Sequence, residues 1–175
     1  MKKTVLVFGI ISGVISSILM LAYLPFMEKI GYDKGFIVGY TGMVISFALI
    51  FFGIRSYREN NGGGFISFGK AFKVGILIAV ISCIFYVATW EVIYYKIMPD
   101  FADNYGKYEI DQMRKEGAAQ EKIDMAINEA KDFKKMYDNP FYNIGMTFME
   151  PLPVGLLITL ISAAILRKKK PLVNS

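Results

Sequence analysis

The chain has 175 residues, of which 54% are hydrophobic and 20% are charged, and its mean hydropathy is +0.41. The charges occur in blocks between long apolar runs, which is typical of membrane proteins rather than of soluble domains. Histidine is absent and Cys83 is the sole cysteine, so histidine-based proton transfer, an internal disulfide and a cysteine-based zinc site are excluded.

Four segments are long and apolar enough to cross a bilayer as helices, which takes about 20 residues each. The first follows Lys2 and Lys3 as in a signal peptide, but its apolar run is too long and it lacks a small-residue cleavage site. We predict an all-α, polytopic membrane protein of a single domain, residues 1–175, built as a four-helix bundle. The expected spans are residues 4–27, 36–54, 71–97 and 145–166.

Small residues recur on the first two predicted helices, mostly four positions apart. They are Gly9, Gly13 and Ser17 on the first helix, and Gly35 and Gly39 on the second. Such spacing lets helix backbones approach closely in lipid. We expect these residues to pack within the bundle, and the alternative is a face for a homo-oligomer.

The distribution of lysine and arginine predicts the orientation of the chain. One side of the predicted membrane carries a single acid, Glu59, and ten bases: Lys2, Lys3, Arg55, Arg58, Lys70, Lys73, Arg167, Lys168, Lys169 and Lys170. The other side has a neutral hairpin (Glu28, Lys29, Asp33 and Lys34) and a loop at 98–143 that holds ten acids and seven bases. We therefore expect a multi-pass protein of the bacterial inner membrane, with both termini in the cytoplasm and the long loop outside it.

The stretch GFISFGKA, residues 64–71, matches seven of the eight positions of the nucleotide-binding pattern G-x-x-x-x-G-K-[ST]. That motif needs a preceding strand, and a serine or threonine after the lysine to ligate magnesium. Here a membrane helix is expected to precede it and residue 71 is alanine, so we predict no nucleotide binding. Instead we expect a turn at 60–64, with Ser67 capping the third helix. The bases on either side are expected to face the anionic leaflet of the lipid bilayer rather than a nucleic acid: Arg55, Arg58, Lys70 and Lys73.

Several blocks of the sequence resemble a known family. They are GIRSYR (53–58) with ISFGKAF (66–72), Asn139-Pro140, and TFMEPLPVG (147–155) leading into ISAA (161–164). Together they are similar to the bacterial membrane-protein family catalogued as domain of unknown function 4199, over nearly the whole chain. The resemblance implies four helices and an extracytoplasmic segment between the third and the fourth. It carries no activity with it.

The long loop is polar in composition, yet its apolar residues keep helical spacing. They are Ile123, Ala126, Ile127, Ala130, Phe133 and Tyr137. Asn139-Pro140 is expected to end this helix, and Gly117 to separate it from a shorter one that begins near Tyr105. We predict an extracytoplasmic helical hairpin over the outer mouth of the bundle. Its apolar stripe is expected on the bundle, on the lipid surface, or on a membrane or extracytoplasmic protein partner, for which the candidate surface is Ile123, Ile127 and Phe133.

Two carboxylates, Glu91 and Glu150, fall in the third and fourth predicted helices at a similar expected depth. Ionisable groups at such depth mark function or a specific pairing. A close pair can share a proton or hold an ion, and Pro151 and Pro153 would loosen the helix beside Glu150. The alternative is structural: the acids pair with lysines, and Glu150 stabilises a helix N-terminus.

Two functions of different classes therefore stay open. The first is an accessory or interaction protein that acts through its extracytoplasmic loop, and the alternative is a small oligomeric transporter or channel component that uses Glu91 and Glu150. No pairing of a nucleophile with a base is visible, so an enzyme is disfavoured. We expect no catalytic residue, no metal and no cofactor.

Overall fold

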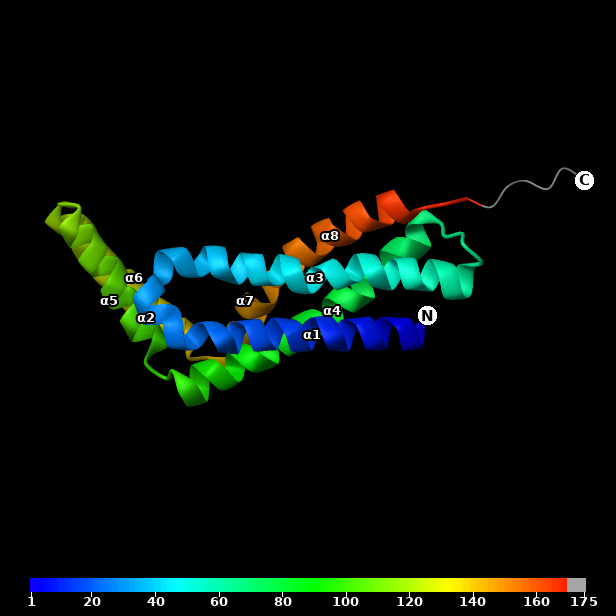
Figure 1. Ribbon diagram of the computed structural model, residues 1–175. Coiled ribbons are helices and arrows are strands. Elements are labelled where there is room, and N and C mark those ends of the chain that lie inside the picture. The colour runs from blue at the N-terminus through cyan, green and yellow to red at the C-terminus, as the bar shows by residue number, and fades with distance from the viewer. Residues whose placement is uncertain (170–175) are drawn as a thin grey trace, which may run out of the picture.

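The computed structural model describes residues 1–169, apart from the side chains of Glu28, Lys29 and Asp33. The side chains of those three members of the predicted neutral hairpin, and the basic residue Lys170, thus lie outside what is described. The described chain is almost wholly helical, which confirms the all-α class (Figure 1). In chain order the helices are α1 (Lys2–Tyr23), a 3-10 turn (Leu24–Phe26), α2 (Met27–Ile30), α3 (Tyr32–Gly62), α4 (Phe68–Val92), a π turn (Ile93–Ile97), α5 (Phe101–Lys115), α6 (Gln120–Tyr137), α7 (Pro140–Met149) and α8 (Pro151–Leu166).

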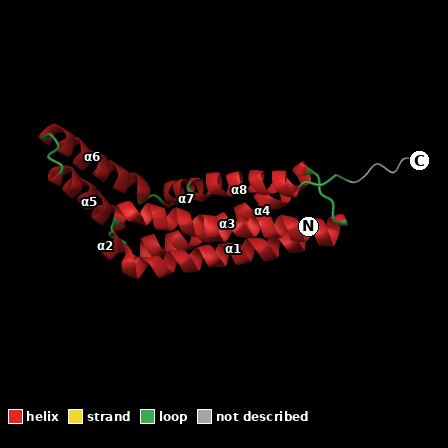
Figure 2. Ribbon diagram, turned by 45° about the horizontal axis from the view of Figure 1, so that its top comes forward, coloured by secondary structure: helices red, strands yellow, loops and turns green. Residues whose placement is uncertain are grey.

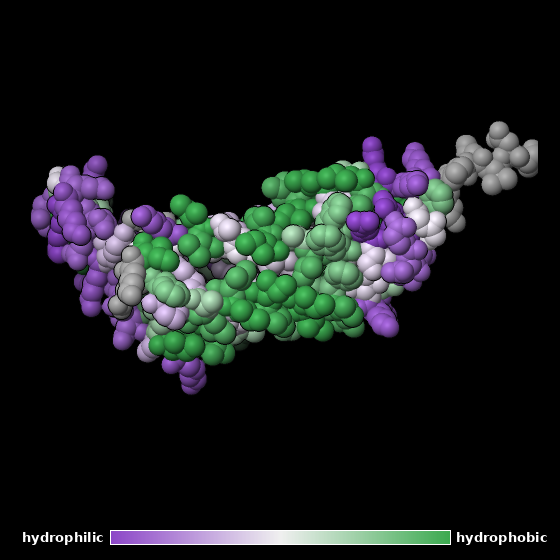
Figure 3. Space-filling view, in the orientation of Figure 1, coloured by the Kyte–Doolittle hydropathy of each residue, from purple (hydrophilic) through white to green (hydrophobic). Residues whose placement is uncertain are grey.

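Four stretches of the described residues are long and apolar enough to cross a membrane, as predicted. They are Lys2–Phe26, Lys34–Gly62, Phe68–Ile97 and Pro140–Leu166. Their outward side chains are apolar, including Leu6, Ile18, Ile37, Ile84 and Ile165, whereas Ser12, Ser46 and Ser82 are buried. Figure 3 shows the resulting apolar band between two polar ends. This inside-out distribution is the one that lipid favours.

The second spanning helix is longer than predicted. We expected it to end at Ile54 with a turn at 60–64, but α3 continues to Gly62. The turn is made by Gly63 and Gly64, whose φ angles of 58° and 82° favour glycine. Ser67 then caps α4 as predicted, since its side chain accepts a hydrogen bond from the Lys70 backbone N–H at 3.4 Å. The polar residues after Ile54 therefore extend the helix beyond the apolar band.

The fourth spanning segment begins earlier than predicted and consists of two helices. α7 begins at Pro140, not near residue 145, because the Asn139 side chain accepts a hydrogen bond from the Phe141 N–H and proline suits the first helical position. The break between α7 and α8 falls at Glu150. Pro151 and Pro153 follow it and have no backbone N–H to continue the hydrogen bonds of α7.

The small residues of α1 pack against α4. Gly9, Gly13 and Ser17 face Ile81, Phe85 and Thr89 respectively, and a Cβ at Gly13 would lie 2.6 Å from the Phe85 Cβ. Ser17 and Thr89 share a hydrogen bond of 2.7 Å. On α3 the two glycines differ: Gly35 lies against the Tyr23 hydroxyl, but Gly39 is exposed and a Cβ there would meet nothing within 4 Å. Close packing within the chain thus involves Gly9, Gly13, Ser17 and Gly35, and not Gly39.

The core lies where α3, α4 and α8 meet. It includes Phe47, Ile50, Ile54, Ile78 and Cys83. The Ser12 hydroxyl of α1 lies 2.8 Å from the Ser46 carbonyl oxygen of α3 and 3.1 Å from the Ser82 hydroxyl of α4. Polar contacts of this kind join helices where no water is available.

α5 and α6 form a helical hairpin at the end of the molecule away from the N-terminus and from the end of α8 (Figures 1 and 2). α5 begins at Phe101 rather than near Tyr105, and Gly117, with a φ of 72°, ends it as predicted. The hairpin does not lie flat over the spanning helices; it projects beyond them at an angle (Figure 1). Its two helices pack mainly against each other, and a Cβ at Gly106 would lie 3.0 Å from that of Ala130.

Candidate functional site

Glu150 lies at the break in the fourth spanning segment and has a partner on α4. The Tyr86 hydroxyl donates a hydrogen bond of 2.9 Å to its Oε2 atom. Neither side chain is exposed. A hydrogen bond to a carboxylate is worth about 1.5–3 kcal/mol, so this bond holds the break in the fourth segment against α4. The sequence did not single out Tyr86. The only feature that could have marked this residue is its polar hydroxyl within an apolar run.

Glu91 lies on α4 five residues after Tyr86, which places it about 140° further around the helix. Its Oε1 atom is buried without a hydrogen-bond partner among the described residues, and so is Nε1 of Trp90. Glu91 therefore projects from a different side of α4 than Tyr86, the residue through which Glu150 contacts this helix. The described structure gives Glu91 and Glu150 no shared hydrogen bond.

Tyr137, at the end of α6, is a residue whose pKa is influenced by both carboxylates. Burial raises its pKa, and the charges of Glu150 and Glu91 raise it further. Its hydroxyl lies 3.3 Å from Oγ1 of Thr147. Thr147 donates to the Asn143 side chain at 3.0 Å, and Asn143 donates to the Tyr137 carbonyl oxygen at 3.2 Å. This closed set of bonds fastens the base of the hairpin to α7.

Asp138 fastens the same base to α4. The Tyr94 hydroxyl donates to its carboxylate at 2.7 Å, and the Tyr95 hydroxyl donates to its carbonyl oxygen at 3.2 Å. Both tyrosines lie in the π turn at Ile93–Ile97. A π turn has more residues per turn than an α-helix, so consecutive side chains diverge less and both phenols reach one residue. The sequence offered the aromatic pair but no sign of this turn.

Beyond this base, the hairpin has a groove on each of its two faces. The larger, about 730 Å³, we name the tyrosine groove; it is lined by residues that include Tyr105, Tyr108, Met113, Met125 and Phe133. The other, about 390 Å³, we name the lysine groove, and its lining residues include Lys107, Ile110, Ile127, Lys131, Lys134 and Lys135. Neither groove is lined by Glu91 or Glu150. The hairpin therefore has apolar side chains open on both faces.

The structure separates the three residues of the predicted partner surface. Ile123 is 5% exposed and lies inside the hairpin, so it reaches no partner while the hairpin is closed. Ile127 lines the lysine groove, and Phe133 lines the tyrosine groove on the opposite face. Pairing of α5 with α6 buries only one side of each helix. The apolar residues of α6 are therefore divided among the hairpin interior, the lysine groove and the tyrosine groove.

An ion pair joins α5 and α6 at the rim of the lysine groove. Lys134 donates to the Asp103 carboxylate, and this hydrogen bond raises the pKa of Lys134. The pair is partly exposed, so its contribution to stability is small. The pair links the two helices across that rim.

The stretch GFISFGKA comprises the connection from α3 and the first residues of α4, at the end of the molecule that carries the N-terminus. Helix α3 and a glycine turn precede it, and Ile66 pairs with Lys168 through two backbone hydrogen bonds of 3.0 and 2.9 Å. The strand that a nucleotide-binding loop requires does not precede it in the described chain. The absence of nucleotide binding stays a prediction.

The four bases near this stretch have different surroundings. Arg55 and Lys73 are exposed. Arg58 pairs with Glu59 and donates a hydrogen bond of 3.2 Å to the Leu166 carbonyl oxygen, and the Lys70 ammonium lies 5.9 Å from the centre of the Tyr57 ring. Arg58 thus caps the C-terminal end of α8. The expected contact of all four bases with lipid stays a prediction.

Comparison with known proteins adds one finding. A family model described as "Protein of unknown function (DUF4199)" matches residues 7–168. No curated protein matches the chain, and no solved structure does.

Proposed function

Because the chain belongs to the DUF4199 family, whose description assigns no activity, we propose a function from the geometry: a membrane-anchored interaction protein whose hairpin is its binding element. The observation that carries this proposal is a two-helix hairpin that projects beyond the apolar band with a groove on each face. Two helices alone bury one interface, and their other apolar side chains stay open to a partner. Helices seated in such grooves are a common mode of protein recognition.

The charges and apolar residues of the lysine groove support one kind of protein partner. Its floor includes Ile110 and Ile127, and its rim carries four lysines and two aspartates. This balance favours a segment with acidic residues around an apolar anchor, because opposite charges across an interface speed association and exclude other partners. Lys131 and Lys135 are exposed and available to such a segment.

Photo-crosslinking in cells tests this proposal. A photoreactive phenylalanine replaces Ile127, and the matched control replaces Asp132, which is exposed on the same helix and lines neither groove. We expect a discrete crosslinked product from position 127, much weaker from position 132, and lost when Lys131→Glu and Lys135→Glu reverse the charge of the rim. Equal products from the two positions, or a product that survives charge reversal, would contradict the proposal.

Two observations favour a second function, a transporter or channel component. The Glu91 Oε1 atom is buried and unpaired among the described residues, and Glu150 lies beside a broken helix, a recurring arrangement for ion sites. Under this alternative, Glu91→Gln and Glu150→Gln would each abolish cation- or proton-coupled flux in proteoliposomes at unchanged protein level. Normal flux in both variants would exclude it.

A further inference from the structure

We propose that the tyrosine groove rests on the surface of the bilayer, so that the hairpin lies partly in the lipid headgroup layer. This inference concerns the face opposite the lysine groove. It depends on the chain spanning a membrane and not on the protein partner proposed above.

The first support is the direction in which the groove faces. Tyr32 lies two residues before the spanning stretch Lys34–Gly62, and its ring packs against Tyr105 and Tyr108 with centroids 5.4 and 5.1 Å apart. Those two tyrosines also line the groove. The face of α5 that carries the groove is therefore turned back toward the start of a spanning helix, while the lysine groove lies on the other face.

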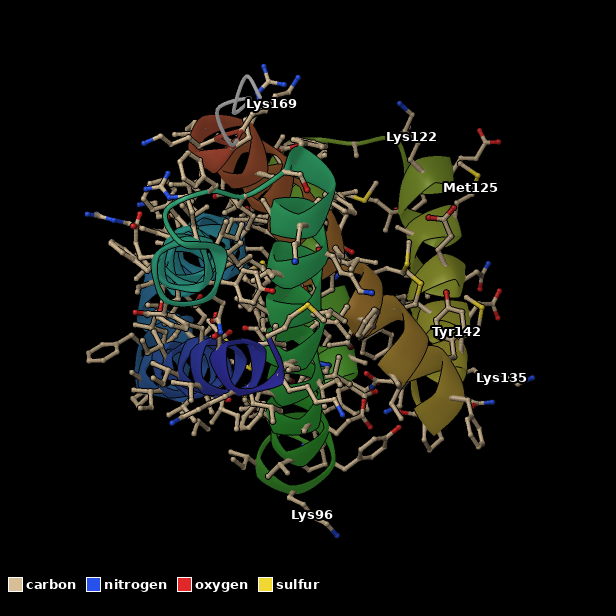
Figure 4. The ribbon with its side chains drawn as sticks, turned by 90° about the vertical axis from the view of Figure 1, so that its right-hand side faces the viewer. Lys96, Lys122, Met125, Lys135, Tyr142 and Lys169 are labelled. Carbon is tan, nitrogen blue, oxygen red and sulfur yellow. The ribbon has the colours of Figure 1, made fainter. Side chains whose placement is uncertain are left out.

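The second support is the position of α6. Figure 4 views the molecule from the end that carries the N-terminus, roughly along α1 and α3. In this view the N-terminal half of α6, which carries Lys122 and Met125, lies to one side of the spanning helices. No spanning helix of the described chain lies beneath this half. In a membrane, the space beneath it belongs to lipid. Figure 1 shows that the hairpin is inclined to the spanning helices rather than aligned with them.

The third support is the chemistry of the groove. Its tyrosine rings and methionine thioethers are amphipathic or adaptable groups that suit the boundary between headgroups and acyl chains. Met125 is 52% exposed, which is costly in water but favourable at that boundary. Exposed apolar residues also occur on α7, the first helix of the fourth spanning stretch, where Phe141 is 88% exposed and Met149 is 60% exposed.

The charges predict how the contact forms. The tyrosine groove has one lysine, Lys122, and two glutamates, Glu109 and Glu129, whereas the lysines of the hairpin gather in the opposite groove. Attraction to anionic lipid therefore contributes little, and the contact depends on the aromatic and thioether side chains. It should form equally in zwitterionic and in anionic membranes.

The test uses an environment-sensitive fluorophore on a single introduced cysteine, with the full chain in nanodiscs of phosphatidylcholine. Met125→Cys reports on the tyrosine groove, and Lys131→Cys, exposed on the same helix, reports on the lysine groove. The native Cys83 is buried, and the unsubstituted chain, labelled in parallel, measures its background. Each sample is titrated with iodide in the water and, separately, with a headgroup spin-labelled phosphatidylcholine.

We expect the label at 125 to be quenched by the spin-labelled lipid and shielded from iodide several-fold relative to the label at 131. The same result is expected when anionic lipid is added. Equal access of iodide to both labels overturns the proposal. Shielding from iodide without quenching by the spin-labelled lipid also overturns it, because protein, such as a second copy of the chain, would then cover the groove.

Discussion

At the scale of single residues, the bond between Tyr86 and Glu150 gives the broken fourth segment a defined position. Glu150 follows α7 directly and precedes two prolines, which have no backbone N–H. Backbone hydrogen bonds across the break are therefore lost, and the position of α8 relative to α4 depends on side-chain contacts. The Tyr86 hydroxyl, at 2.9 Å, supplies such a contact from α4. The acid that the sequence marked as unusual is thus held by a residue that the sequence left unmarked.

Tyr86→Phe should lower the free energy of unfolding by about 1.5–3 kcal/mol, because a carboxylate that is not exposed loses its donor. Denaturant unfolding in detergent, followed by Trp90 fluorescence, measures the loss. Tyr142→Phe, on the exposed surface of α7, is the control and should change little.

A double-mutant cycle with Glu150→Gln makes the assignment specific, since the two losses should not add if the residues act through one bond. Additive losses, or an equal loss in Tyr142→Phe, would show that the bond does not stabilise the break.

At the scale of elements, α1 and α4 owe their close approach to residues without large side chains. Gly9, Gly13 and Ser17 face Ile81, Phe85 and Thr89 at matching intervals of four. In lipid, helices gain little from burying apolar area, so the contact depends on van der Waals packing and on the bond between Ser17 and Thr89.

Gly13→Ala should cost about 1–3 kcal/mol, because the new Cβ would lie 2.6 Å from the Phe85 Cβ, an atom that no rotamer can move. Gly39→Ala is the matched control: its Cβ meets nothing within 4 Å, so we expect no loss. Thermal unfolding of both variants in detergent measures the difference. Equal losses would contradict packing of α1 on α4 as the reason for Gly13.

At the scale of the whole molecule, the polar residues collect at the two ends of an apolar band (Figure 3). One end carries the N-terminus, the end of α8 and the bases around GFISFGKA, and the other carries the hairpin. Basic residues are retained on the cytoplasmic side of membranes. The termini are therefore predicted in the cytoplasm, and the hairpin outside it.

Cysteines introduced at Glu116, in the turn of the hairpin, and at Lys169, near the C-terminus, test this orientation. A membrane-impermeant maleimide applied to cells whose inner membrane is intact should label Glu116→Cys and leave Lys169→Cys unlabelled until the membrane is permeabilised. The opposite pattern would reverse the predicted topology, and labelling of both would contradict an even number of crossings.

The sequence by itself determined the features that follow from local patterns. Long apolar runs predicted the number of spanning helices, because a minimum length is needed to cross hydrocarbon. Helical spacing and Gly117 predicted the hairpin, and the glycine spacing on α1 predicted its close packing. The sequence did not predict the extension of α3, because the residues after Ile54 are polar and include Asn60, Asn61 and Gly62, which are typical of a loop, whereas the helix continues to Gly62.

Only the tertiary structure decided how distant residues meet. It joined Glu150 to Tyr86 and Asp138 to two tyrosines of the π turn. It also divided one apolar stripe of α6 between the hairpin interior and two opposite grooves. Spacing along a helix specifies which residues share a face, but what covers that face depends on how the other helices pack against it.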